Sequence, residues 1–210
     1  NLLLTLGGLG IAAAAWRYWP EDGLVNPCRP EAIPDSLLQH DLVKAAWSGI
    51  DPTQFWDCHV HLVGTGDSGS GVWVNPNMQS VTHPVQWAQY VFYLNASCIE
   101  KEDDMDRDYI RRLRNLMAPL PEGVKLMLLA FDYFHDESGE RHLEGSAFHA
   151  PDAYATMIAQ EYPDQFEWIA SIHPYRRDAV EALHLAHSQG ARAVKWLPPA
   201  QGMDPASPLC

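Results

Sequence analysis

Basic residues are scarce in this sequence, which has 14 Lys and Arg against 27 Asp and Glu and therefore a formal net charge of −13. So acidic a surface repels phosphate backbones, which argues against a nucleic-acid partner. Charged residues make up only 20% of the chain, whereas 47% is hydrophobic, and this balance excludes a disordered protein. The length of 210 residues suits one domain or part of a larger one.

Cysteine is also rare, and none of the four residues are close enough in sequence to form the CxxC motif of zinc or redox sites. The simplest interpretation of Cys28, Cys58, Cys98 and Cys210 is that they are free, mostly buried thiols. In an exported protein, a disulfide between Cys28 and a second cysteine is the alternative.

Charge is absent from Leu2 to Trp16, where the sequence reads LLLTLGGLGIAAAAW. This run is shorter than the roughly 20 residues that cross a bilayer, but its composition is typical of the apolar core of an export signal or membrane anchor. We therefore predict a signal or anchor segment over residues 1–19, and a protein that is exported or anchored in the inner membrane and lies in the periplasm. An ordinary buried helix is the alternative. A Pro-rich connector with a short helix over 35–48 follows, spanning residues 20–53.

From residue 54 onward, short apolar runs alternate with helical periodicity. Four runs are bounded by Gly or Pro, as is typical of strands covered on both faces: 54–63, 124–132, 166–173 and 191–197. Helical patterns lie between them, over 106–117, 151–162 and 177–189. This alternation predicts a parallel sheet, which is either half of an eight-stranded barrel or a small open sheet.

Two histidines end the first of these strands, in the sequence DCHVH at residues 57–61. Alternate residues of a strand face the same way, so the side chains of His59 and His61 point together. Two neighbouring imidazoles at the end of a buried strand can bind one divalent ion. Because a Gly-rich loop follows, where a barrel carries its active site, we favour a metal pair over two solvated or core histidines.

Polar side chains also end the other three strands. Lys195 shares a strand face with two alanines. A charged amine on such an inward face is costly unless it pairs with a carboxylate, loses its proton or is carboxylated by carbon dioxide. Because a carboxylated lysine can bind metal ions, Lys195 is a third candidate metal ligand. His173, Arg176 and Asp132 are candidate substrate-binding residues. The simpler alternatives are a salt bridge for Lys195, a capped turn with solvated arginines at His173 and Arg176, and a turn-initiating carboxylate for Asp132. The acidic run 100–108 is most simply a solvated helix start.

The segment FWDCHVHLVGTGDSGSG over 55–71 resembles the opening strand and loop of the amidohydrolase superfamily, and more closely its amidohydrolase-related (type 2) branch. FEWIASIHPYRRDAVEAL over 166–183 and GARAVKWLPPAQGMDP over 190–205 carry the same resemblance. It implies a TIM-type (β/α)8 barrel, of which residues 54–210 supply about the first four β/α units, preceded by the apolar N-terminal segment. The chain is then a fragment of a longer protein.

The resemblance also implies a divalent metal, zinc first, with manganese or iron as alternatives. His59 and His61 match the family's ligand pair on the first strand. Lys195 lies where some members have a bridging carboxylated lysine and others have no ligand.

The activity that the resemblance implies is metal-dependent hydrolysis of an amide, ester or lactone-type carbonyl in a small-molecule substrate. The family's remaining ligands and catalytic Asp lie on later strands, so we expect the catalytic residues outside this sequence and the fragment alone to be inactive. A metal-dependent decarboxylase on the same barrel is one alternative. A non-catalytic module that is tethered to the membrane by its N-terminal segment is another. The oligomeric state stays open, a homo-oligomer included.

Overall fold

A computed structural model describes residues 33–99 and 103–210. Within them, three parallel strands form one sheet in the order β1 (Trp56–His61), β3 (Lys125–Leu129) and β5 (Phe166–Ile169). A second sheet pairs two short antiparallel strands, β2 (Trp73–Val74) and β4 (Phe148–His149). The predicted signal or anchor segment, residues 1–19, lies outside the described residues.

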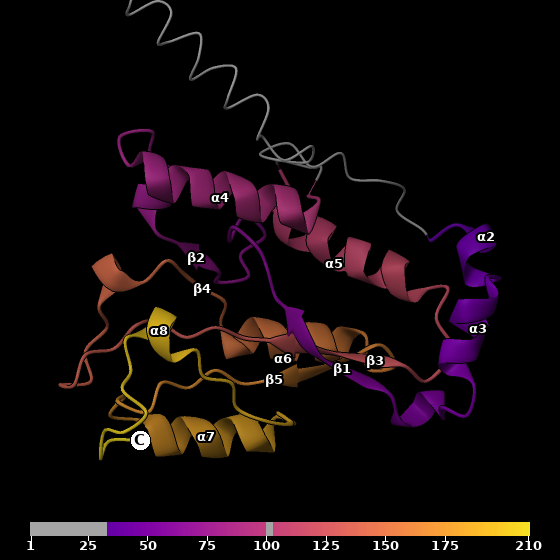
Figure 1. The fold of residues 1–210 in the computed structure, drawn as a ribbon. Coiled ribbons are helices and arrows are strands. Elements are labelled where there is room, and N and C mark those ends of the chain that lie inside the picture. The colour runs from indigo at the N-terminus through magenta and orange to yellow at the C-terminus, as the bar shows by residue number, and fades with distance from the viewer. Residues whose placement is uncertain (1–32, 100–102) are drawn as a thin grey trace, which may run out of the picture.

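Seven α-helices and three 3-10 helices accompany these strands in the described part of the chain (Figure 1). The α-helices are α2 (Asp35–Leu38), α3 (Asp41–Trp47), α4 (Pro84–Ser97), α5 (Met105–Met117), α6 (Asp152–Glu161), α7 (Ala179–Ser188) and α8 (Pro198–Gln201). The 3-10 helices are η1 (Pro52–Gln54), η2 (Pro76–Gln79) and η3 (Leu143–Gly145). None of the helices in the described ranges combines the length and the apolar character that a membrane crossing requires.

The prediction of a (β/α)8 barrel is wrong. The described residues form an open three-stranded sheet and a separate two-stranded sheet, whereas a barrel requires one sheet that closes on itself. The predicted fourth strand, 191–197, is reduced to a single parallel bridge between Ala170 and Val194. Two backbone hydrogen bonds flank this bridge, from Ala170 N to Ala193 O at 2.9 Å and from Lys195 N to Ala170 O at 2.8 Å. The periodicity of strands and helices indicates which side chains are buried locally. It does not indicate which distant strands pair, and the closure of a sheet into a barrel depends on that pairing.

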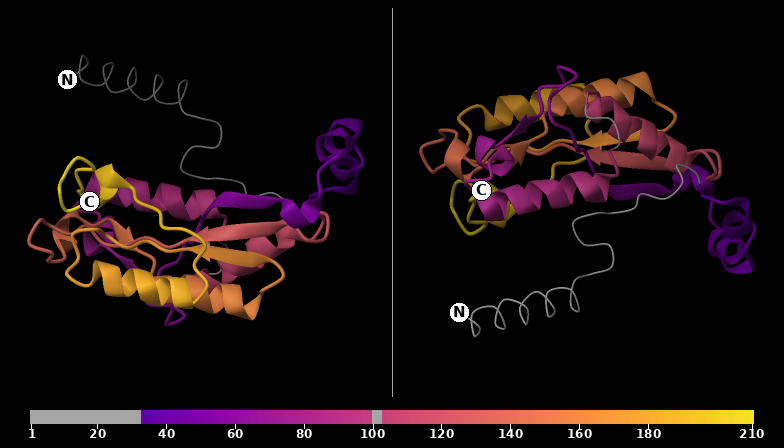
Figure 2. Two further views of the ribbon diagram at one scale, coloured as in Figure 1. Left: turned by 90° about the horizontal axis from the view of Figure 1, so that it is seen from below. Right: turned by 90° about the horizontal axis from the view of Figure 1, so that it is seen from above.

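The main core lies on one face of the parallel sheet. Figure 2 shows α6 and α7 on this side and α4 on the other. Leu128 of β3 and Trp168 of β5 are 0% and 1% exposed, and they belong to one apolar cluster with side chains of α5 and α6 such as Ile110 and Ile158. Burial of one such side chain contributes about 1.5–3 kcal/mol, so this cluster is the main source of stability. The other face has a smaller buried cluster of Met127, Leu129 and Ile169.

The helices predicted between the strands are confirmed as α5, α6 and α7. Helix α6 begins directly after Pro151, and α7 ends before Gly190, whose φ of 92° suits the left-handed residue that stops a helix. The helix predicted over 35–48 is instead divided into α2 and α3. His40 has an extended backbone between them, and its Nδ1 accepts a hydrogen bond from Leu42 N at 3.2 Å, which caps α3.

The Gly- and Ser-rich loop after β1 is held in place by Asp106, in the first turn of α5. This carboxylate is fully buried and not solvated as the sequence suggested. It accepts hydrogen bonds from Thr65 N at 2.6 Å, Gly66 N at 3.1 Å, Ser68 Oγ at 2.9 Å and Ser70 Oγ at 2.5 Å. Burial raises the pKa of this carboxyl, but the hydrogen bonds, that of Ser70 first, outweigh burial and leave the pKa below its usual value.

Replacing Asp106 with Ala leaves these loop donors without their acceptor. We expect the free energy of unfolding to fall by about 3 kcal/mol, measured by urea denaturation, because desolvated donors that lose a charged partner are costly. The matched change Asp103→Ala removes an exposed carboxylate from the same stretch of chain, and it should stay within about 0.5 kcal/mol of the parent. Equal losses in the two variants would contradict the anchoring role of Asp106.

Candidate functional site

The imidazoles of His59 and His61 lie side by side at the carboxyl end of β1. Their Nε2 atoms are 3.1 Å apart and their ring centroids 5.1 Å apart, so the prediction that the two side chains point together is confirmed. Both residues are exposed, as is most of β1. The backbone N–H of His59 also donates to Asp57 Oδ1 at 3.0 Å, which fixes the strand just before the pair.

The amine of Lys195 reaches the same place from the last strand-like segment. Its Nζ lies 3.5 Å from His59 Nε2. None of the ion pairs between described residues includes Lys195, so the salt bridge considered from the sequence is not present among them. Burial lowers the pKa of Lys195. Burial, followed by the charges of Lys195 and His59, also lowers the pKa of His61.

The spacing of the two imidazoles fits two nitrogen ligands on one divalent ion. With metal–nitrogen bonds of about 2.0–2.1 Å, two ligand atoms are about 2.9 Å apart at a right angle and about 3.4 Å apart at the tetrahedral angle. The observed 3.1 Å lies between these values, although a hydrogen bond between the rings has a similar length. Nowhere in the described ranges do three or more His, Cys, Asp or Glu side chains form a metal-binding group. The described residues therefore supply two imidazoles and the Lys195 amine.

The three substrate-binding candidates meet in a second cluster, built around Asp132. Its Oδ2 accepts hydrogen bonds from His173 N at 2.9 Å and from Arg176 Nη1 at 3.0 Å, and its Oδ1 lies 3.8 Å from His135 Nε2. Burial raises the pKa of this carboxyl, but His135, the His173 N–H and Arg176 hold the pKa far below its usual value. Asp132 is therefore ionised throughout the physiological range.

The polar atoms of this cluster are largely occupied by one another. His173 is fully buried, its Nε2 donates to Gln201 O at 2.8 Å, and its Nδ1 accepts from Tyr175 N at 3.2 Å. These partners fix the neutral tautomer that carries its proton on Nε2. Arg176 pairs with Asp178 at 2.8 Å as well as with Asp132. In this arrangement His173 ties the end of β5 to α8 and has no free ring nitrogen.

Two histidines near this cluster, the buried His135 and the half-buried His149, were missed by sequence reasoning. His135 Nε2 and His149 Nδ1 have no hydrogen-bond partner among the described residues. His149 stacks on Tyr133 with ring centroids 4.0 Å apart, and burial lowers the pKa of His149 to about 4. Neither residue lies in a periodic segment of the sequence. His149 is placed by the two-residue pairing of β4 with β2, which has no local signal.

Asp152 supports the carboxyl edge of the sheet from the first turn of α6. Its Oδ1 accepts a hydrogen bond from Ser171 N at 2.9 Å. The Ser171 hydroxyl in turn accepts from Asp132 N at 3.0 Å and lies 3.3 Å from Lys195 O, to which it donates. One serine thus links three neighbouring strand ends. Burial raises the pKa of Asp152 to about 6.

The variant Asp152→Asn tests this link through its pH dependence. Because the pKa is about 6 in the folded chain and about 3.8 in a model peptide, the folded state is favoured by this carboxyl below pH 4 and loses that advantage as the pH rises through 6. Asn does not titrate and keeps an oxygen acceptor for Ser171. We expect the variant to gain unfolding free energy relative to the parent between pH 4 and pH 7, on the order of 2 kcal/mol.

Urea denaturation at several pH values measures this difference. The control Asp164→Asn makes the same substitution at an exposed carboxylate three residues after the end of α6. A difference for Asp152→Asn that does not vary with pH, or that the control reproduces, would show that the Asp152 carboxyl is not desolvated.

Comparisons with known proteins leave the family open. No family model, no curated protein and no solved structure matches the chain. They neither support nor oppose the resemblance of residues 55–71, 166–183 and 190–205 to the amidohydrolase superfamily. A function for this chain has to be argued from the geometry of the described residues.

Proposed function

We propose that the chain is part of a metal-dependent hydrolase, with His59 and His61 as metal ligands at the carboxyl edge of the parallel sheet. The observation that carries this proposal is the 3.1 Å separation of the two Nε2 atoms, with the Lys195 amine 3.5 Å from one of them. The ion pair between the buried Asp132 and the half-buried Arg176 lies at the same edge of the sheet. The amidohydrolase resemblance of the segments that carry these residues points to the same chemistry.

The protonation state of Lys195 determines whether this side chain can take part in metal binding. As an ammonium group it repels a divalent ion at this distance. As a neutral amine it can attack carbon dioxide: an N–C bond forms, one C–O π bond of carbon dioxide breaks and one N–H proton is released. The resulting carbamate has one negative charge shared by two oxygens that could bind a metal. The lowered pKa and the lack of a carboxylate partner among the described residues both favour the neutral amine. We therefore assign Lys195 as a candidate third ligand after carboxylation.

The chain's own residues bind and orient in this proposal. A bound divalent ion would act as a Lewis acid and lower the pKa of a bound water molecule toward neutrality. Zinc is the first candidate, with manganese or iron as alternatives. The amide, ester or lactone carbonyl of a small-molecule substrate is the reacting group. Asp132 and Arg176 form an ion pair, and we propose that this pair stabilises the edge of the sheet where the substrate binds. A hydrolase incorporates labelled oxygen from water into its product. The alternative, a decarboxylase, releases carbon dioxide and incorporates no labelled oxygen.

We also propose that the protein is exported. Cys98, at the end of α4, is disulfide-bonded, whereas Cys58 and Cys210 are free thiols. Disulfides persist mainly in oxidising compartments such as the periplasm, which supports the export predicted from the apolar N-terminal run.

Zinc binding by the full chain tests the metal site. We expect the parent to bind about one zinc ion per chain in isothermal titration, and His59→Ala and His61→Ala each to weaken binding by about tenfold or more, since each removes one of two nitrogen ligands. The control His184→Ala removes an exposed histidine from α7 and should bind zinc as the parent does. Equal binding by all four proteins, or none by the parent, would overturn the proposal and favour a non-catalytic module.

A further inference from the structure

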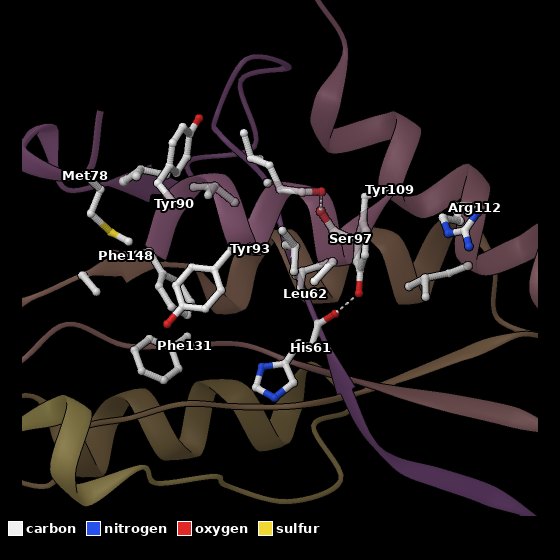
Figure 3. Close-up of a pocket in the computed structure, with 18 of the residues that line it drawn as sticks. His61, Leu62, Met78, Tyr90, Tyr93, Ser97, Tyr109, Arg112, Phe131 and Phe148 are labelled. Carbon is white, nitrogen blue, oxygen red and sulfur yellow. Dashed lines mark hydrogen bonds between the residues drawn. The ribbon is translucent and has the colours of Figure 1, made fainter. Parts of the chain in front are cut away.

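A cavity of about 640 Å³ lies between α4, α5 and the residues that follow β1. Figure 3 shows Met78, Tyr90, Tyr93 and Phe148 gathered at one end of it, Arg112 at the other, and His61 at its margin. The cavity therefore borders His61, one of the proposed metal ligands. Its volume lies within the range of about 300–1,000 Å³ that is typical of small-molecule sites.

The walls of this cavity are built by packing between distant segments. Phe148 of β4 stacks on Phe131 with ring centroids 4.5 Å apart, and Tyr93 of α4 meets the same ring edge-on at 6.4 Å. On the side of β1, the Tyr109 hydroxyl donates to His61 O at 2.6 Å, which ties α5 to the strand that carries the proposed ligands. The apolar walls are thus held in place by contacts within the chain.

The lining is almost free of charge. Among the described residues that line it, Arg112 alone has a full charge at neutral pH, and the other polar side chains are those of Tyr90, Tyr93, Ser97, Tyr109 and His61. Ser97 already donates its hydroxyl proton to Leu94 O at 2.9 Å. A polar or charged substrate body loses water in such a cavity without gaining partners, whereas an apolar body gains from burial.

We propose that this cavity binds the bulky apolar part of the substrate and so places the reacting carbonyl beside His61. The substrate class is then esters, amides or lactones with a large uncharged hydrocarbon or aromatic portion. The position of the carbonyl rests on the proposed function. The binding of an apolar molecule in the cavity does not.

Binding of the neutral fluorescent probe N-phenyl-1-naphthylamine to the full chain tests the cavity. Leu94→Asp places a charge in the wall and Ala96→Phe fills space there, so we expect each to weaken probe binding by about tenfold or more. The control Leu183→Asp makes the first change on the exposed face of α7, where Leu183 is 46% exposed, and should bind the probe as the parent does. Unchanged binding in both cavity variants, or equal weakening in the control, overturns the proposal.

Two further measurements separate this proposal from the metal site. Leu94→Asp should bind zinc as the parent does, and His59→Ala should bind the probe as the parent does. If the parent binds zinc but not the probe, the cavity proposal alone is wrong. If the parent binds the probe but not zinc, the proposed function alone is wrong. Finally, Co²⁺ should quench the bound probe in the parent and not in His59→Ala. If both bind and the probe is not quenched, the cavity does not adjoin the metal site.

Discussion

Parallel pairing of β1, β3 and β5 is the constraint on which the candidate site depends. Because the strands run the same way, their carboxyl ends share one edge, where side chains far apart in the sequence meet. Alternation along β1 then turns His59 and His61 to one face. A slip of one residue in the pairing of β1 with β3 would turn both imidazoles to the opposite face. The hydrogen bonds of Ser171 and Asp132 hold the neighbouring strand ends in position.

Features that depend on local pattern are predictable from this sequence. Short apolar runs give β1, β3 and β5, helical periodicity gives α5, α6 and α7, and the alternation of residues 57–61 gives the two facing imidazoles. The approach of Lys195 to His59 follows from the same argument, since both belong to strand-like segments with parallel directions. In these cases neighbouring residues decide the element or the face, and the shared direction of parallel strands then brings their carboxyl ends together.

Features that depend on distant contacts are not predictable in this way. The open sheet in place of a barrel, the pairing of β2 with β4 and the burial of His135 all arise from packing between segments tens of residues apart. Helix α4 has no clear sequence signal because its apolar and aromatic residues do not form one stripe. The acidic run 100–108 predicts a solvated helix start, and only the hydrogen bonds of Asp106 to the Gly- and Ser-rich loop explain its burial.

We expect one divalent ion to bind between the imidazoles of His59 and His61. X-ray absorption spectroscopy at the zinc edge, on the zinc-loaded chain, measures the neighbours of that ion. The expected spectrum has two imidazole nitrogens at about 2.0–2.1 Å and oxygen atoms as the other neighbours. A sulfur neighbour at about 2.3 Å, which the exposed thiol of Cys58 can supply from the same strand, would contradict it, as would a spectrum without imidazole scattering.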